Sequence, residues 1–171
     1  MDDLYEYEPL EPKRKELLLS LGLLGVALFL LGLSQIPGLP FPAAFQFGMM
    51  LFLAASIMVY TRYISRRYSY RVEPCDNGTE MTPPDFTVTE YYSRRTTVVC
   101  RISLSDIAEV TRVTSQNRKQ LAAAVKGKRV YHYTCHMAPQ NLTLLTVNDG
   151  EGVFYIRIQT DEKLFSILQN S

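Results

Sequence analysis

Two long apolar stretches open the chain, and neither shows a polar face at helical spacing. They cover residues 17–36 and 42–63, and Arg62 is the only charged side chain within them. At about 1.5 Å rise per residue, each stretch can cross a hydrocarbon core roughly 30 Å thick. The pattern predicts a transmembrane hairpin at residues 17–63, with spans at 17–36 and 42–63, behind an N-terminal tail of residues 1–16.

Two other interpretations fit the apolar stretches less well. A secretory signal peptide also has a basic region before its apolar run, but that run has only about 7–15 residues and is followed by a small-residue cleavage site. Here a second long apolar stretch follows almost at once. A helical hairpin buried in a soluble core would carry a polar face where it meets water.

Basic residues at the ends of the stretches predict the orientation in the membrane. They are Lys13, Arg14 and Lys15 before the first stretch, and Arg62, Arg66 and Arg67 after the second. The linker at residues 34–41 has no charge and contains Pro37, Gly38 and Pro40, which favour a tight reversal. Because cytoplasmic loops carry the excess of Lys and Arg, we expect a multi-pass protein of the cell membrane with both termini in the cytoplasm.

The pattern changes after the second apolar stretch to short segments rich in Val, Ile, Thr, Tyr and Phe, separated by turn residues. Such segments are typical of β-strands. Short connections at residues 93–95 and 148–151 indicate antiparallel hairpins. The sequence therefore predicts a mostly antiparallel cytoplasmic domain at residues 64–171. Its expected strands are residues 68–73, 85–92, 96–103, 107–113, 129–137, 141–147 and 152–159.

Two helices are predicted within this domain. Residues 115–126 begin with Ser115 as a capping residue, continue with strong helix formers and end before Gly127. Residues 161–169 follow Thr160 as a cap, and they place Leu164, Phe165 and Leu168 on one face. We expect this second helix to cover the open end of a β-barrel.

The layout of about seven antiparallel strands and a C-terminal helix resembles that of pleckstrin-homology-like domains. Residues 91–110 resemble the strand–turn–strand core of the bacterial members, in which a basic turn precedes an I-x-L-x-D-I-x-x-V run. The matching positions are Ile102, Leu104, Asp106, Ile107 and Val110. Pairing with a transmembrane hairpin is similar to the plan of YcxB-like membrane proteins. The resemblance implies an α+β membrane protein of bacterial type with a PH-like barrel, and a binding or scaffolding role.

Metal and thiol chemistry receive little support from the sequence. The segment His132-Tyr133-Thr134-Cys135-His136 holds both histidines, but in a strand Cys135 would point away from them. The three cysteines, Cys75, Cys100 and Cys135, have no disulfide-framework spacing, as is usual in a reducing compartment. We predict no metal site, no cofactor and no catalytic residue.

Charge and small residues suggest two kinds of contact. The chain has 18 Lys and Arg against 17 Asp and Glu, so it lacks the basic excess of a nucleic-acid-binding protein. Local basic groups could still contact an anionic headgroup or a partner: Arg94 and Arg95 in a predicted turn, and Arg62, Arg66 and Arg67 beside the membrane. Small residues in the spans could pack helices within the hairpin or in a homo-oligomer: Gly22, Gly25, Ala44 and Gly48.

These features predict a membrane-anchored, non-enzymatic interaction or regulatory module on the cytoplasmic side. Its expected partners are the lipid bilayer and a protein, a peptide or an anionic headgroup. The alternative is a subunit of a membrane complex in which the hairpin is the functional part. An enzyme is a weaker interpretation, because we find no nucleophile–base pair, phosphate-binding glycine loop or spaced carboxylate pair.

Overall fold

The structure is a computed structural model that describes residues 5–9, 12–39, 41–73, 84–150 and 152–170. It divides into two compact units, one formed by residues 11–66 and the other by residues 1–10 together with 67–171. We refer to them as the hairpin unit and the β domain, and describe each by itself.

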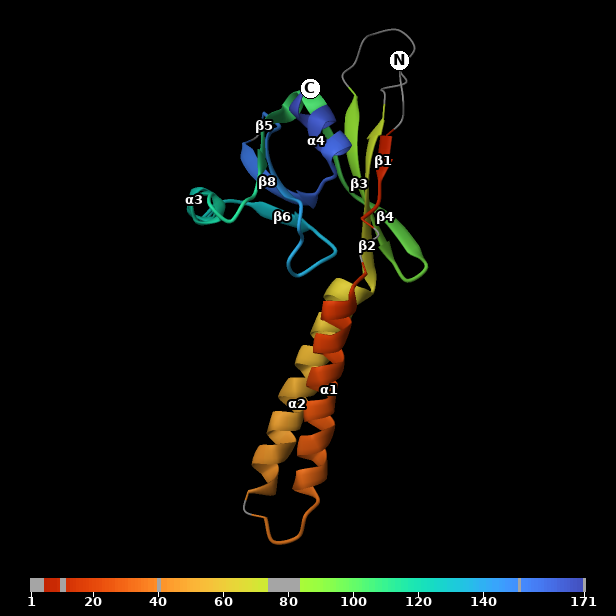
Figure 1. Ribbon diagram of the computed structural model, residues 1–171, viewed down its shortest axis with the longest axis vertical. Helices are drawn as coiled ribbons and strands as arrows, with labels where there is room; N and C mark the ends of the chain where they lie inside the picture. The colour runs from red at the N-terminus through yellow and green to blue at the C-terminus, as the bar shows by residue number, and fades with distance from the viewer. Residues whose placement is uncertain (1–4, 10–11, 40, 74–83, 151, 171) are drawn as a thin grey trace. The chain divides into compact units, whose positions relative to one another are not determined.

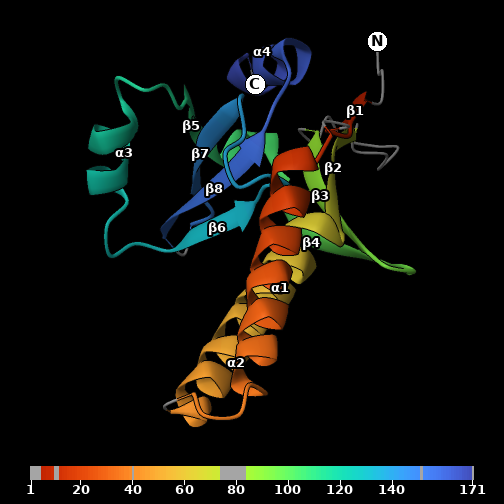
Figure 2. The same ribbon diagram turned by 60° about the horizontal axis from the view of Figure 1, so that its bottom comes forward.

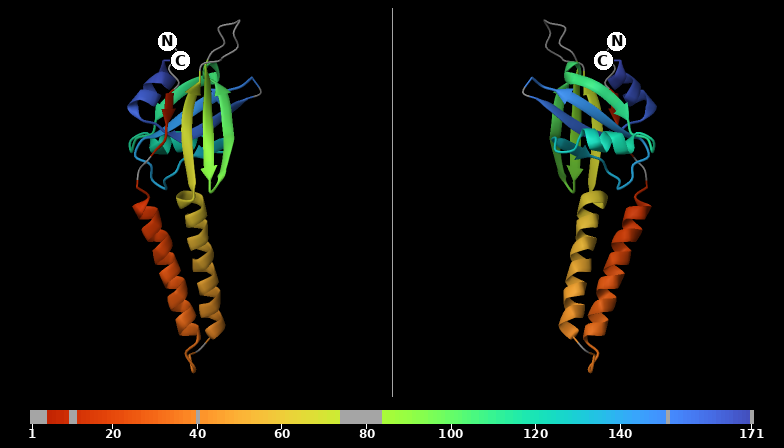
Figure 3. Two further views of the ribbon diagram at one scale, coloured as in Figure 1. Left: turned by 90° about the vertical axis from the view of Figure 1, so that its right-hand side faces the viewer. Right: turned by 90° about the vertical axis from the view of Figure 1, so that its left-hand side faces the viewer.

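The hairpin unit consists of α1 (Arg14–Ser34) and α2 (Pro42–Val59), which lie side by side (Figure 3). The proline at the first position of α2 suits a helix start, because its missing N–H would have no partner there. One turn of π-helix, η1 (Tyr60–Ile64), extends α2. Both predicted helices are confirmed, and both are long and apolar enough to cross a membrane. Large apolar side chains such as Leu18, Phe29 and Phe47 are 65–69% exposed.

The first sheet of the β domain has the strand order β1-β2-β3-β4. Its strands are β1 (Tyr5–Tyr7), β2 (Arg66–Glu73), β3 (Asp85–Tyr92) and β4 (Arg95–Ser103). The predicted bounds of β3 are confirmed, and those of β4 are confirmed to within a residue. The β3–β4 turn is shorter than expected, because Tyr92 already pairs with Arg95 and Ser93 takes a left-handed conformation.

Strand β1 comes from the stretch that the sequence suggested was only a tail. Tyr5, Glu6 and Tyr7 pair antiparallel with Val72, Arg71 and Tyr70 of β2. The Glu6 carboxylate accepts hydrogen bonds from Ser69 and Arg71, at 2.6 and 3.0 Å. The hydrogen bond from Ser69 and the Arg71 guanidinium lower the pKa of Glu6. The β domain therefore uses chain from both sides of the hairpin.

The second sheet has the strand order β5-β7-β8-β6. Its strands are β5 (Ile107–Arg112), β6 (Val130–Tyr133), β7 (Leu142–Asn148) and β8 (Val153–Gln159). The β7–β8 hairpin is confirmed, and Gly150 supplies a positive φ in its turn. A short helical turn, η2 (Leu104–Asp106), carries the chain from β4 of the first sheet into β5.

The expectation of one β-barrel is wrong. The strands form two sheets, the barrel is not closed, and β6 runs parallel to β8. The physical reason lies in residues 113–129, which carry the chain from β5 at one edge of the second sheet to β6 at the other edge, beside β8. The strand predicted at residues 129–137 also ends early, at Tyr133. Beyond it the Cys135 N–H bonds to the buried Gln159 side chain at 3.3 Å instead of to a neighbouring strand. The coarser prediction of an α+β plan with mostly antiparallel strands holds.

Helix α3 (Arg118–Ala124) lies on the outer side of the second sheet, away from the first sheet (Figure 2). Val125, Leu144 and Tyr155 form a small cluster there. The helix is shorter than predicted, because Ser115 does not cap it. Thr114 and Asn117 hydrogen-bond reciprocally ahead of it, at 2.7 and 3.4 Å. Gly127 follows with a positive φ, as the sequence suggests.

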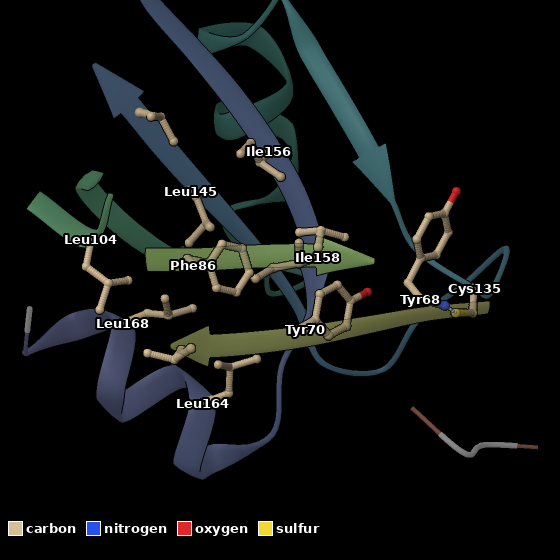
Figure 4. Packing of buried hydrophobic residues seen from close by; sticks show 13 residues of the cluster. Tyr68, Tyr70, Phe86, Leu104, Cys135, Leu145, Ile156, Ile158, Leu164 and Leu168 are labelled. Carbon is tan, nitrogen blue, oxygen red and sulfur yellow. Dashed lines mark hydrogen bonds between the residues drawn. The ribbon is translucent and has the colours of Figure 1, made fainter. Parts of the chain in front are cut away.

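The main core lies between the two sheets and is covered on one side by α4 (Glu162–Gln169). Figure 4 shows Leu164 and Leu168 pointing from α4 toward Phe86 and its neighbours. Both leucines are at most 2% exposed, which confirms the predicted covering helix. Its cap is Asp161 and not Thr160, since the Asp161 carboxylate accepts from the Leu164 N–H at 2.8 Å. In Figure 1, α4 lies between β5 and β1.

Candidate functional site

A groove opens on the side of the β domain where β4 and β6 end their respective sheets. It has a volume of about 910 Å³, at the upper end of the roughly 300–1,000 Å³ of small-ligand sites. Residues 99–103 of β4 form one wall. The start of β6, the η2 corner and the β7–β8 turn supply the others. The groove therefore exists because the barrel does not close between β4 and β6.

The β4 wall is a strand edge and not a strand face. Successive side chains of a strand point to opposite faces, so a pocket against one face would be lined by alternate residues. Here residues 99, 100, 101, 102 and 103 all line the groove. Main-chain groups of β4 are consequently part of the surface that a ligand would meet.

Aromatic side chains form the floor of the groove. Tyr131 and Tyr133 project from the same face of β6 with stacked rings 6.2 Å apart, and Phe154 of β8 meets Tyr131 edge to face at 5.7 Å. Tyr131 remains 43% exposed. This floor offers apolar surface and ring edges to a ligand.

Tyr133 also bridges the groove to β4. Its hydroxyl donates to the Val99 carbonyl at 3.1 Å. Burial, together with nearby Cys100, raises the pKa of Tyr133 to about 12, so the hydroxyl stays protonated and able to donate at neutral pH. A second hydroxyl, that of Tyr70, donates to the Tyr133 carbonyl, which fixes this end of β6 on the first sheet. The floor is thus preformed.

Charged groups of both signs surround the floor. Arg101 bonds to Asp85 at 2.8 Å, and the Lys128 ammonium bonds to the Tyr155 hydroxyl at 2.9 Å. Arg129, Asp106 and Asp149 also line the groove. With acids and bases interspersed, the groove does not present the single-sign field that concentrates a highly charged ligand.

Cys100 adds no nucleophile to this site at neutral pH. Burial raises the pKa of its thiol to about 11, so the reactive thiolate is scarce. Among the residues that the structure describes, no group of three His, Cys, Asp or Glu side chains could hold a metal ion. His132 is exposed on β6, whereas Cys135 and His136 are buried in the loop after it.

The arginines predicted to contact headgroups lie outside the groove. Arg94 and Arg95 are exposed at the β3–β4 turn, and Arg67 is exposed at the start of β2. The Tyr68 hydroxyl donates to Glu90 at 3.3 Å, which places the start of β2 beside the end of β3. The start of β2 and the β3–β4 turn lie at the same end of the first sheet (Figure 1). The three arginines therefore share that end. Arg62 and Arg66 belong to the hairpin unit and are exposed as well.

The small residues of the spans divide into two groups. A Cβ at Gly48 would lie 3.2 Å from the Leu30 methyl, so Gly48 allows α2 to approach α1 closely. Gly22, Gly25 and Ala44 are exposed, and a Cβ at either of these glycines would meet nothing within 4 Å. Their predicted role between copies of the chain stays a prediction.

The polar contacts between the two arms of the hairpin were missed, because the sequence-based prediction considered only Gly and Ala in the spans. The Ser56 hydroxyl donates to the Ser20 carbonyl at 2.9 Å, and the two hydroxyls lie 3.2 Å apart. Lys13 donates to the carbonyls of Ile64 and Arg66 at the end of η1. Serines inside apolar helices are a usable signal, because they often bond across helices in membranes.

Gly48→Leu should separate the two helices near the closed end of the hairpin, because the larger side chain would collide with Leu30. In a chain carrying Ser20→Cys and Ser56→Cys, the added leucine should slow disulfide formation several-fold in detergent. Gly22→Leu is the matched control and should leave the rate unchanged. Equal slowing by both leucines would show that Gly48 has no special position in the interface.

Comparisons with protein-family models, curated proteins and solved structures found no match. The resemblance to pleckstrin-homology-like and YcxB-like proteins therefore stays a prediction, and the functional argument is drawn from the geometry.

Proposed function

We propose that the chain is a membrane-anchored, non-enzymatic binding module with a regulatory or scaffolding role. In this proposal the hairpin unit is embedded in the cell membrane and both termini are cytoplasmic. The β domain holds a protein or peptide partner in the groove between β4 and β6. The observation that carries the proposal is this preformed groove, in which an aromatic floor lies beside an open strand edge.

Two observations support the membrane anchor. Most exposed side chains of α1 and α2 are apolar. An exposed apolar surface of this extent is typical of a segment that contacts a membrane or another protein. In addition, β1 precedes the hairpin and β2 follows it, yet the two strands pair. Two spans would return the chain to the side of the membrane from which it started, so the pairing of β1 with β2 supports the proposed arrangement.

The proposal gives the exposed arginines a supporting role at the membrane surface. Near an anionic leaflet each basic side chain contributes about 1 kcal/mol to association. We assign Arg62, Arg66 and Arg67, which follow the second span directly, to headgroup contact. Arg94 and Arg95 share the sheet end that holds Arg67 and could add to it.

Site-specific photo-crosslinking in native membranes tests the proposal. A photoreactive phenylalanine at Tyr131, in the groove floor, should give a discrete adduct with a cellular protein, and that adduct should resist carbonate extraction from the membrane. The same residue at Lys119, exposed on α3 outside the groove, is the control and should give no such adduct. Identical adducts from both positions, or none from Tyr131, would refute a partner in the groove.

A further inference from the structure

The orientation of main-chain groups along β4 indicates what kind of ligand the groove takes. The Leu104 N–H donates to the Pro84 carbonyl at 2.9 Å, so residue 104 faces the β3 side. Antiparallel pairing alternates between residues that face the neighbouring strand and residues that face away. The main-chain groups of Ser103 therefore point away from β3. The Val99 carbonyl also points away, because it accepts from Tyr133 across the groove.

No other strand covers this outer side of β4 within the described part of the chain. An outer strand edge is a template for one more strand. The edge here lies inside a groove of about 910 Å³ and so has room beside it for an extended chain. Many peptide-binding domains use this mode, in which main-chain bonds provide affinity and pockets for alternate side chains provide specificity.

The aromatic floor has the spacing that an added strand requires. Alternate side chains of a strand are about 6.6 Å apart, since each residue rises roughly 3.3 Å. The stacked rings of Tyr131 and Tyr133 are 6.2 Å apart. Two side chains on one face of an added strand could therefore each meet one ring.

The charges around the groove favour an occupant without strong net charge. Arg101 lies on the β4 wall and pairs with Asp85, while the Lys128 ammonium is held by the Tyr155 hydroxyl and lies over its ring at 5.2 Å. Arg129 adds a third base to the lining and Asp106 and Asp149 add two acids, so the charges of the groove nearly balance. An anionic headgroup or a phosphopeptide would meet these acids, whereas a neutral peptide would not be repelled.

We propose that β4 binds an extended, uncharged segment of a partner protein as an added strand, with apolar or aromatic side chains at alternate positions over Tyr131 and Tyr133. This inference rests on the proposed function and specifies the partner of the same groove.

Ser103→Pro tests strand addition at a position where the backbone tolerates proline. Ser103 has φ −70° and ψ 141°, close to the values that proline adopts, and its N–H points away from β3. The substitution thus removes an outer N–H without breaking the β3–β4 ladder. Ser103→Ala is the matched control, because it removes the same hydroxyl but keeps the N–H.

The measurement uses the full chain in nanodiscs of zwitterionic lipid and a display library of short linear peptides as the probe. We expect selected peptides to be uncharged and to alternate apolar residues. Ser103→Pro should weaken their binding about tenfold or more, since a main-chain bond is lost and the peptide carbonyl is left unsatisfied. Ser103→Ala should bind like the wild type, and both variants should melt at the wild-type temperature.

Other outcomes would overturn the inference in distinguishable ways. One such outcome is that Tyr131→Ala weakens the binding of the selected peptides whereas Ser103→Pro does not. That result would support a ligand in the groove and refute strand addition. Selection of no Tyr131-dependent peptide would refute a peptide occupant. Capture of anionic vesicles or of a second copy of the chain through Tyr131, in place of peptides, would assign the groove to those ligands.

Discussion

Replacing Leu164 and Leu168 together by alanine should unfold the β domain at physiological temperature. Both side chains are almost fully buried against the core that Phe86, Leu145 and Ile158 share. Each buried leucine-to-alanine change costs about 2–5 kcal/mol, and a domain has only about 5–15 kcal/mol of stability in total. In the double variant, residues 67–171 should become sensitive to protease. The protein should still be recovered by detergent from the membrane fraction, because the hairpin unit is unchanged.

Gln169→Ala on the same helix is the control for the leucine variant. Gln169 is exposed, so its truncation should leave the protease resistance and the melting temperature unchanged within error. A cooperative melt of the double-leucine variant near the wild-type temperature would mean that α4 is not needed to cover the core.

The sequence predicted best those elements whose pattern is local. Polar and apolar residues alternate over Asp85–Thr89, and the bounds of the strand, Asp85–Tyr92, were predicted as observed. Glu162–Gln169 places Leu164 and Leu168 on one face, and that face is the buried one. In both cases the side-chain period fixes which residues meet the core, and no distant partner has to be known.

The elements that the sequence missed depend on distant partners. Tyr5–Tyr7 is a strand of only three residues, too short for a period to be visible, and its partner Tyr70 lies beyond the whole hairpin. Similarly, residues 134–137 continue the strand-like composition of β6, but the buried Gln159 side chain takes the Cys135 N–H. Such a side-chain competitor cannot be identified before the fold is known.

The groove could not be predicted because it depends on which strands fail to pair. Tyr131, Tyr133 and Phe154 look like ordinary strand residues in the sequence. They become a floor only because β6 joins the second sheet in parallel with β8 and leaves β4 at the end of the first sheet. The basic turn at Arg94 was identified from the sequence as a candidate contact site, yet it lies outside the groove.

Replacing Tyr5, Glu6 and Tyr7 by serine should destabilise the β domain by about 2–4 kcal/mol. The two tyrosines pack partly buried against the core, with the Tyr7 ring 6.2 Å from that of Tyr70, and the Tyr5 hydroxyl bonds to Asp161 at the start of α4. Burying such side chains contributes up to about 1.5–3 kcal/mol each. At about 4–8 °C per kcal/mol, the melting temperature should fall by roughly 10 °C or more.

The same variant should also self-associate more readily, and its stability should depend less on pH than that of the wild type. Loss of β1 uncovers the edge of β2, which can then pair with another chain, so light scattering should rise on mild heating. Because the hydrogen bond from Ser69 and the Arg71 guanidinium lower the native pKa of Glu6, its contribution to stability is present at neutral pH and is lost when acid protonates the carboxylate. The stability difference from the wild type should therefore narrow in acid.

Glu8→Ser, at an exposed position beside the strand, is the control and should change neither self-association nor the pH dependence of stability. If the β1 variant melts at the wild-type temperature, β1 does not stabilise the β domain.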